Sequence, residues 1–181
     1  EITISSYNKT AEEYFKVVSE FDMLPEIFEF TNLVKENGKI LDLGCGPGHH
    51  AKFFSEKGFD IVGIDLSEKM IELAKKVAPH AYFEVMDISL LTFPPDSFDG
   101  IWASASLLHV PKDEIQSVIQ KLYEVLKQNG ILYLSLKLGE SEDFFSDHRY
   151  GGVEKFYVYY KPNEIETILI NANFKIMHHG F

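Results

Sequence analysis

A glycine-rich segment that joins a strand-like run to a helix-like run is the strongest constraint on the fold of this chain. It reads ILDLGCGPGHH: an apolar run over Lys39–Leu43 ends in Gly44, Gly46 and Gly48, and a helical pattern follows over His49–Lys57. Glycines let the backbone turn sharply and approach a ligand without a Cβ clash. Such a loop is either a plain tight turn or the binding site of a nucleotide-like ligand. The segments around it in the sequence distinguish these two roles.

The same alternation continues along the chain. The further strand-like runs are Asp60–Ile64, Ala81–Met86, Gly100–Ala103 and Ile131–Leu136. The helix-like runs between them are Glu68–Val77, Leu107–Val110 and Glu114–Leu126. Strands that alternate with helices predict an α/β fold, in which right-handed crossovers build a doubly wound, mainly parallel sheet with helices on both faces.

Both ends of the chain add elements to this core. Spacings of three and four between apolar residues predict two helices before the glycine segment, Lys9–Glu20 and Leu24–Lys35. After Leu138 we expect a polar loop over Gly139–Lys155, a strand over Phe156–Tyr160, a helix over Pro162–Asn171 and a strand over Phe174–His178. A length of 181 residues fits a single domain. We divide it into a helical amino-terminal part, 1–36, and a core, 37–181.

Composition narrows the classes of partner. Lys and Arg number 17 against 28 Asp and Glu, and the net charge of -11 repels nucleic acid backbones and anionic lipid head groups. A single cysteine, Cys45, excludes an intrachain disulfide and a cysteine-based metal site, and we predict no metal site. No apolar run approaches the roughly 20 residues that span a bilayer, and no signal pattern opens the chain. We therefore expect a cytoplasmic protein with a small-molecule partner, no nucleic acid and no membrane; its oligomeric state stays open.

Aspartates end the first two strand-like runs. Asp42 lies two residues before the first glycine of a G-x-G-x-G pattern, whereas the dinucleotide fingerprint is G-x-G-x-x-G and seats a pyrophosphate. An aspartate there would repel a pyrophosphate and attract a cationic α-amino group. Asp65, in DIVGIDLS, is suited to accept both hydroxyls of a ribose. The alternative role of Asp65, a helix cap, is already supplied by Ser67.

A third aspartate, Asp87, ends the third run in YFEVMDIS and is suited to accept from an exocyclic amine such as that of adenine. Met86 and Ile88 are placed to pack on the base. Because the carboxyl ends of neighbouring parallel strands meet at the topological switch point, Asp42, Asp65 and Asp87 should surround one crevice.

Together these segments resemble class I S-adenosylmethionine-dependent methyltransferases, in particular the small-molecule branch related to the ubiquinone and menaquinone biosynthesis methyltransferases. The resemblance runs from about residue 5 to residue 178 and is carried by ILDLGCGPGHHAKFFSEKGFDIVGIDLSEKMIELAKK, Asp87, FPPDSFDGIWASASLLHVP and a strand ending in YLSLK. It implies a Rossmann-like core and S-adenosyl-L-methionine as the cofactor. ASAS replaces the Asn/Asp-Pro-Pro-Tyr motif of the protein- and adenine-directed branches, which favours a small acceptor.

The resemblance also assigns roles to residues. The predicted cofactor-binding set is Tyr14, Asp42, Gly44, Gly46, Gly48, Asp65, Leu66, Met86, Asp87, Ile88 and Ala103. In it the glycines wrap the methionine part, Asp65 holds the ribose, Asp87 holds the adenine amine, and the carbonyl of Ala103 lies near the ammonium. SYNKTAEEY matches an aromatic pattern that often opens chains of this family. Its Tyr7 and Tyr14 are expected to lie in a lid formed by residues 1–36, with Tyr7 on the substrate side.

Few catalytic residues are needed, because methyl transfer from a sulfonium requires mainly positioning and, for weak nucleophiles, a base. His109 in LLHVP is the candidate base, since histidine titrates near neutral pH; the alternative is a structural histidine that anchors the loop. Arg149 and Tyr150 are predicted to bind the substrate. Arg149 would suit a carboxylate or phosphate, unless it is an ordinary solvated arginine.

The prediction is therefore an S-adenosylmethionine-dependent methyltransferase that acts on a small molecule. The alternatives are a non-catalytic module that binds the same cofactor and an NAD(P)-dependent oxidoreductase, which the glycine spacing and Asp42 disfavour. The resemblance implies the sheet order 3-2-1-4-5-7-6, yet the chain stops at Phe181, after the sixth expected strand. A seventh strand is not evident, so either the natural chain is longer or another strand takes that place.

Overall fold

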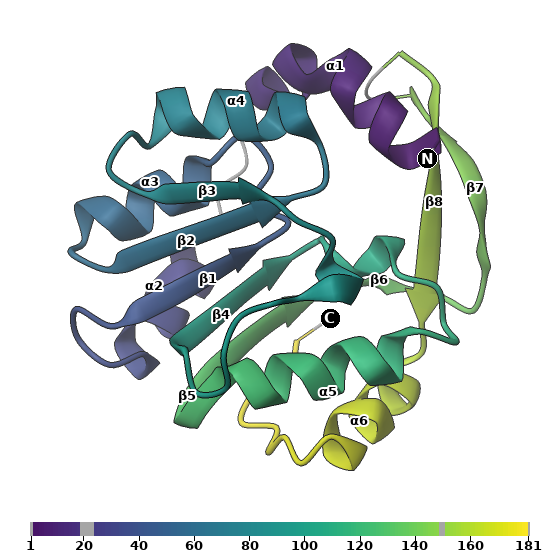
Figure 1. The fold of residues 1–181 in the computed structure, drawn as a ribbon. Coiled ribbons are helices and arrows are strands. Elements are labelled where there is room, and N and C mark those ends of the chain that lie inside the picture. The colour runs from purple at the N-terminus through teal and green to yellow at the C-terminus, as the bar shows by residue number, and fades with distance from the viewer. Residues whose placement is uncertain (1, 19–23, 149–150, 181) are drawn as a thin grey trace.

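The centre of the molecule is a five-stranded sheet in which every neighbouring pair of strands is parallel. The computed structural model describes residues 2–18, 24–148 and 151–180. The sheet order is β3-β2-β1-β4-β5 (Figure 1). The strands are β1 (Lys39–Leu43), β2 (Asp60–Asp65), β3 (Tyr82–Val85), β4 (Phe98–Ser104) and β5 (Leu126–Ser135). The predicted α/β fold with a mainly parallel sheet is confirmed.

Helices cover both faces of this sheet, as a doubly wound fold requires. They are α1 (Ile2–Val18), α2 (Leu24–Leu33), α3 (His49–Glu56), α4 (Glu68–Val77), α5 (Ile115–Val125) and α6 (Pro162–Asn171), with two short 3₁₀ turns, η1 (Ile88–Leu90) and η2 (Leu107–His109). Successive side chains of β1 point to opposite faces. Ile40 therefore packs with α2, α3 and α4, whereas Leu41 and Leu43 pack with α5. None of the helices in the described part of the chain is long and apolar enough to cross a membrane.

The segment predicted as a polar loop, Gly139–Lys155, is mostly a strand, and that prediction is wrong. It contains β7 (Glu142–Asp147), which pairs antiparallel with β8 (Val153–Tyr160), while β6 (Lys137–Leu138) pairs with the other edge of β8. Residues Glu142 to Ser146 are all exposed, so β7 lacks the alternation by which a half-buried strand is recognised. Its conformation depends on backbone pairing with β8, and the small sheet stands beyond the carboxyl ends of the main strands (Figure 1).

The strand predicted over Phe174–His178 is also absent: these residues have no regular structure. Phe174 is half-buried and lies edge-on against Tyr123 of α5, with 5.3 Å between ring centroids. The apolar residues of this segment therefore reflect packing of an irregular chain against the core rather than a sixth strand. Within the described residues β5 is therefore an edge strand of the main sheet, at the end opposite β3.

Candidate functional site

The carboxyl ends of β1 and β2 are joined by hydrogen bonds that fix the glycine segment. Asp65, the last residue of β2, accepts from Gly46 N through Oδ2 at 2.9 Å and from Ser67 N through Oδ1 at 2.8 Å. Ser67 in turn caps α4, since its hydroxyl accepts from Met70 N at 3.2 Å. The Asp65 carboxylate is therefore held in one orientation by two backbone donors, and the cap expected at Ser67 is confirmed.

Glycine stands at the three positions of this segment for different structural reasons. All have positive φ, at 70°, 51° and 84° for Gly44, Gly46 and Gly48. A Cβ on Gly44 would lie 2.5 Å from Ser106 Cβ, and one on Gly48 would lie 2.9 Å from Ala74, so packing requires glycine at both positions. A Cβ on Gly46 would meet only Tyr14 Cε1, at 3.8 Å. Gly46 is thus the glycine whose open side faces α1.

Asp42 is a buried carboxyl group with an unused acceptor. It is 1% exposed, and its Oδ2 has no hydrogen-bond partner among the residues that the structure describes. Burial, reinforced by the negative charge of Asp65, raises its pKa from 3.8 to about 8. Burial raises the pKa of Asp65 as well. Buried polar groups are normally paired, so two adjacent carboxyl groups, one with a free oxygen, fit the approach of a cationic group with further donors.

The remaining residues of the predicted cofactor set lie around the same sheet edge. Asp87 caps η1 by accepting from Ser89 N at 2.8 Å, and Met86 N donates to Asp65 O at 3.1 Å, which ties the end of β3 to β2. Met86, Ile88 and Leu66 are half-buried. The side chain of Ala103 is fully buried in the core, so only its backbone can face a ligand.

A second group of residues lies opposite, between α1 and β8. The Tyr7 hydroxyl donates to His109 Nε2 at 2.9 Å, and Nδ1 of the same ring donates to Phe156 O at 2.6 Å. Since a carbonyl only accepts, Nδ1 carries the proton and Nε2 the lone pair. Burial, together with the charges of Lys155 and Lys137, lowers the pKa of His109 to about 4. His109 is therefore neutral at pH 7 and joins α1 to β8.

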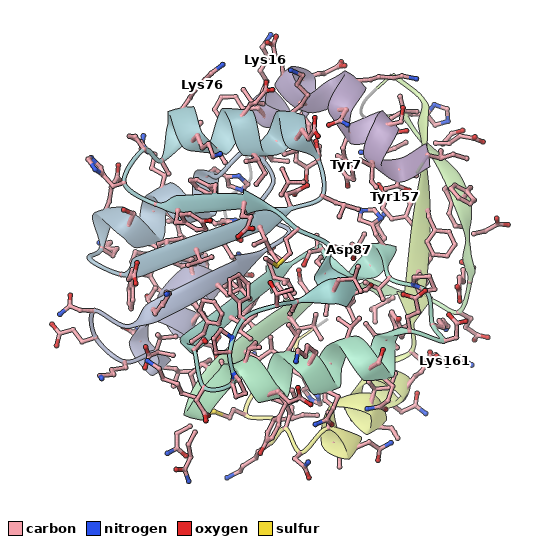
Figure 2. All side chains as sticks on the ribbon, in the orientation of Figure 1. Tyr7, Lys16, Lys76, Asp87, Tyr157 and Lys161 are labelled. Carbon is pink, nitrogen blue, oxygen red and sulfur yellow. The ribbon has the colours of Figure 1, made fainter. Side chains whose placement is uncertain are left out.

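Tyr14 connects the two groups. Its ring lies edge-on to Tyr7, with 5.4 Å between centroids, while its Cε1 borders Gly46. Asn8, the residue after Tyr7, accepts from Ser67 Oγ at 2.7 Å and so ties α1 to the start of α4. Figure 2 shows Tyr7 and Tyr157 directed into the space between α1, β8 and the strand ends, with Asp87 on the opposite side.

Three residues of this region were not found by sequence reasoning. Lys155 of β8 is fully buried, with Nζ 3.9 Å from the ring centroid of Tyr7 and 3.7 Å from Asp147 Oδ2. Tyr157 donates to the same Asp147 oxygen at 2.7 Å. A lysine and an aspartate in an apparently polar segment carry no sign of burial, although the aromatic run that contains Tyr157 indicated a strand. Arg149 and Tyr150, the predicted substrate residues, lie outside the described residues.

Comparison with known proteins identifies the family. A family model described as a methyltransferase domain matches residues 40–130, half of the chain. A malonyl-[acyl-carrier protein] O-methyltransferase from Enterobacter lignolyticus is 26% identical over 103 residues. These cover 57% of this chain and 40% of that protein, so the chain spans well under two thirds of this relative's length.

Solved structures agree with the family match. A SAM-dependent methyltransferase from Methanosarcina mazei superposes with a TM-score of 0.76 at 26% identity, covering 87% of this chain and 88% of that one. A 1,6-didemethyltoxoflavin-N1-methyltransferase from Burkholderia thailandensis, bound to 1,6-didemethyltoxoflavin and S-adenosylhomocysteine, shares the fold with a TM-score of 0.74 at 19% identity, covering 94% and 76% of the two chains. The fold is therefore that of a class I methyltransferase, as the order of the strands, the glycine segment and the aspartates at the strand ends together indicate. The chain belongs to the methyltransferase domain family.

Proposed function

We propose that this protein binds S-adenosylmethionine and transfers its methyl group to a small-molecule acceptor in the cytoplasm. The observation that carries the proposal is the pair of buried carboxyl groups beside Gly46: Asp42 has an acceptor oxygen without a partner, and Asp65 is oriented by Gly46 N. A pyrophosphate is a poor fit for such a pair, because its negative charge would be repelled. An ammonium group and ribose hydroxyls would supply the positive charge and the hydrogen-bond donors that the two carboxyl groups need. This favours the sulfonium cofactor over a nicotinamide dinucleotide.

In this proposal Asp42 faces the ammonium group, Asp65 the ribose, and Asp87 the adenine amine, with Leu66, Met86 and Ile88 beside the base and the Ala103 carbonyl near the ammonium. The cofactor supplies an electrophilic methyl group. The chain supplies orientation and the exclusion of water, for which the packing of α1 over Gly46 is suited.

His109 remains the proposed base, with a restriction that follows from its hydrogen bonds. Nδ1 is committed to Phe156 O, so a proton can be accepted only at Nε2, which Tyr7 occupies. A proton from an acceptor would reach Nε2 through the Tyr7 hydroxyl or after Tyr7 has moved. The same two hydrogen bonds also suit a structural histidine that anchors α1 to β8.

Calorimetry with S-adenosylhomocysteine and with NAD tests the cofactor, and a methyl-transfer screen over small acids, phenols, amines and quinone precursors tests the reaction. We expect S-adenosylhomocysteine to bind and NAD not to bind, and we expect at least one acceptor class to release S-adenosylhomocysteine. Binding of NAD alone would reject the proposal. Cofactor binding without turnover of any acceptor would favour the non-catalytic module.

Replacing Asp65 with alanine is expected to weaken S-adenosylhomocysteine binding by about 1.5 to 3 kcal/mol, the range for hydrogen bonds to a charged group. The reason is the loss of the proposed ribose acceptor and of the bond that positions Gly46 N. Calorimetry measures the change. The matched control is Asp60→Ala at the exposed start of the same strand, which should bind like wild type; an unchanged affinity in a folded Asp65 variant would contradict the ribose assignment.

The amino-terminal helix is expected to act as a lid. Its contacts come from Tyr7 to His109, from Asn8 to Ser67 and from Tyr14 to the open side of Gly46, so a ligand beside Gly46 should stabilise the docked helix. Limited proteolysis between residues 5 and 18 should slow when S-adenosylhomocysteine is added, and NAD should leave the rate unchanged. Equal cleavage rates with and without S-adenosylhomocysteine would rule out a ligand-stabilised lid.

A further inference from the structure

Three buried side-chain atoms in or against the glycine segment lack a hydrogen-bond partner. They are Asp42 Oδ2, Ser106 Oγ and His49 Nδ1, for which the described part of the chain supplies no donor or acceptor. A buried polar group that is left unpaired lowers the stability of the folded state, so such groups are uncommon. Three of them around one loop therefore indicate a ligand that supplies the missing partners.

Ser106 follows a strained residue after the end of β4. Ala105 has φ 51°, which residues other than glycine rarely adopt, and its amide donates to Ser135 Oγ at 2.9 Å. Beyond this bend the Ser106 side chain lies against Gly44. Its Cβ is 2.5 Å, and its Oγ 3.5 Å, from the position that a Cβ on Gly44 would occupy. Ser106 is 6% exposed, so the loop holds a buried hydroxyl group directly beside the first glycine.

His49 lies at the other end of the glycine segment, as the first residue of α3. This helix has no side-chain cap, because its N-cap is Gly48, and the partial positive charge of a helix N-terminus favours an anion. Burial lowers the pKa of His49 to about 4, so the ring is neutral at pH 7. A neutral imidazole carries one N–H group, and the proton at Nδ1 makes that buried atom a donor.

The three atoms match the two charges of an α-amino acid. Asp42 offers an acceptor to an ammonium group, as in the proposed function, whereas Ser106 and His49 offer donors to a carboxylate. The aspartates beside the segment are unsuited to a carboxylate, since like charges repel. The amino-acid end of S-adenosylmethionine carries both groups, and the proposed function gives a partner to its ammonium group only.

We propose that Ser106 and His49 bind the carboxylate at the amino-acid end of the cofactor, Ser106 through its hydroxyl group and His49 through Nδ1. The site thereby selects the complete cofactor over its decarboxylated form. This inference rests on the proposed function and adds two residues to the cofactor site. Because the three atoms are covered in the ligand-free molecule, the cofactor reaches them from the open side of Gly46 when α1 lifts, and α1 then closes over the occupied site.

Calorimetry with two ligands tests this selection. S-adenosylhomocysteine is compared with its decarboxylated analogue, which keeps the adenosine, the sulfur and the amine. We expect wild type to bind S-adenosylhomocysteine at least about tenfold more tightly, as hydrogen bonds to a charged group imply. Ser106→Ala and His49→Phe should each lose most of this preference and bind the analogue like wild type. The matched control is Ser117→Ala, which removes an exposed hydroxyl of α5 and should bind both ligands like wild type.

Thermal unfolding without ligand separates a binding role of Ser106 from a structural one. Ser106→Ala removes a buried hydroxyl that no described residue pairs, so it should not lower the melting temperature of the ligand-free protein. Ser67→Ala, which removes the cap of α4, should lower it. A Ser106→Ala protein that melts clearly below wild type would show that the hydroxyl stabilises the fold, and would overturn its role as a donor kept for the ligand.

The two ligands also separate this inference from the proposed function. Equal affinity of wild type for S-adenosylhomocysteine and its decarboxylated analogue would overturn the inference alone. A folded Ser106→Ala or His49→Phe protein that keeps the wild-type preference would overturn the assignment of that residue. Failure of wild type to bind S-adenosylhomocysteine would instead refute the proposed function.

Discussion

Replacing Gly46 with valine is expected to reduce the affinity for S-adenosylhomocysteine at least about 100-fold, which corresponds to about 2.7 kcal/mol. Gly46 has φ 51°, its amide donates to Asp65, and its open side faces Tyr14. A valine side chain would reach Tyr14 of α1 and occupy the side of the loop where the cofactor is proposed to bind. It would also strain a backbone conformation that β-branched residues rarely adopt, and so disturb the bond to Asp65.

The strain and the loss of ligand space can be separated with a second glycine. Gly151, between β7 and β8, has φ 73°, and a Cβ there would meet none of the described residues within 4 Å. Gly151→Val therefore carries a comparable backbone penalty at a position that is not one of the proposed cofactor residues. Both variants should lose thermal stability, but only Gly46→Val should lose S-adenosylhomocysteine binding in calorimetry. Wild-type affinity in folded Gly46→Val would mean that the segment is only a turn.

The cofactor half of the site could be predicted because its residues follow local rules. Each of Asp42, Asp65 and Asp87 lies at or near the carboxyl end of a strand whose apolar run is visible in the sequence, and parallel pairing brings those ends together. The glycine spacing marked the loop between β1 and α3. The sequence did not show that Gly46 has a different role from Gly44 and Gly48. Packing requires glycine at Gly44 and Gly48 because Ser106 and Ala74, which are distant along the chain, lie against them.

The opposite half could not be predicted, because it depends on contacts between segments far apart in the sequence. Tyr7 meets His109 across 102 residues, and Tyr7 and Tyr14 of α1 lie over the buried Lys155 of β8. β7 has no hydrophobic alternation, and its pairing with β8 decides its conformation. The aromatic spacing of Tyr7 and Tyr14 was recognisable, but the cation between their rings was not.

The free energy of unfolding of the ligand-free protein is expected to pass through a maximum near pH 6.5. Below that pH, buried histidines decide the slope. Burial lowers the pKa of His49 to about 4, of His50 to about 3 and of His109 to about 4, from an ordinary value of 6.5. The unfolded chain therefore binds more protons than the folded one between about pH 4 and 6.5, so stability rises with pH in that window.

Above pH 6.5 the contribution of the histidines fades as the unfolded chain loses its remaining histidine protons, and the buried carboxyl groups of Asp42 and Asp65 determine the slope. The carboxyl group of Asp42 has a pKa of about 8 in the folded chain and the ordinary value of 3.8 in the unfolded chain. Between these values the folded chain holds a proton that the unfolded chain has lost. The stabilisation by Asp42 is complete below its unfolded pKa and is lost as pH rises through its folded pKa. One proton corresponds to about 1.36 kcal/mol per pH unit, so the fall between pH 6.5 and 8 stays below about 2 kcal/mol, because Asp42 itself begins to ionise and the last histidine protons offset part of it.

Asp42→Asn should flatten that descending limb, because the amide does not ionise, while the rise below pH 6.5 should remain. Asp65, whose pKa burial also raises, accounts for any remaining fall. Urea unfolding across the pH range measures both limbs, with Asp60→Asn, on the exposed start of β2, as the control that keeps them.

Saturating S-adenosylhomocysteine should also flatten the descending limb in wild type, since an ammonium group beside Asp42 favours its ionised form. Cofactor binding near pH 7 should therefore release a proton, detectable as a dependence of the calorimetric enthalpy on the ionisation enthalpy of the buffer. A descending limb as steep in Asp42→Asn as in wild type would show that Asp42 does not titrate there. Binding without proton release would remove the reason for placing the ammonium group at Asp42.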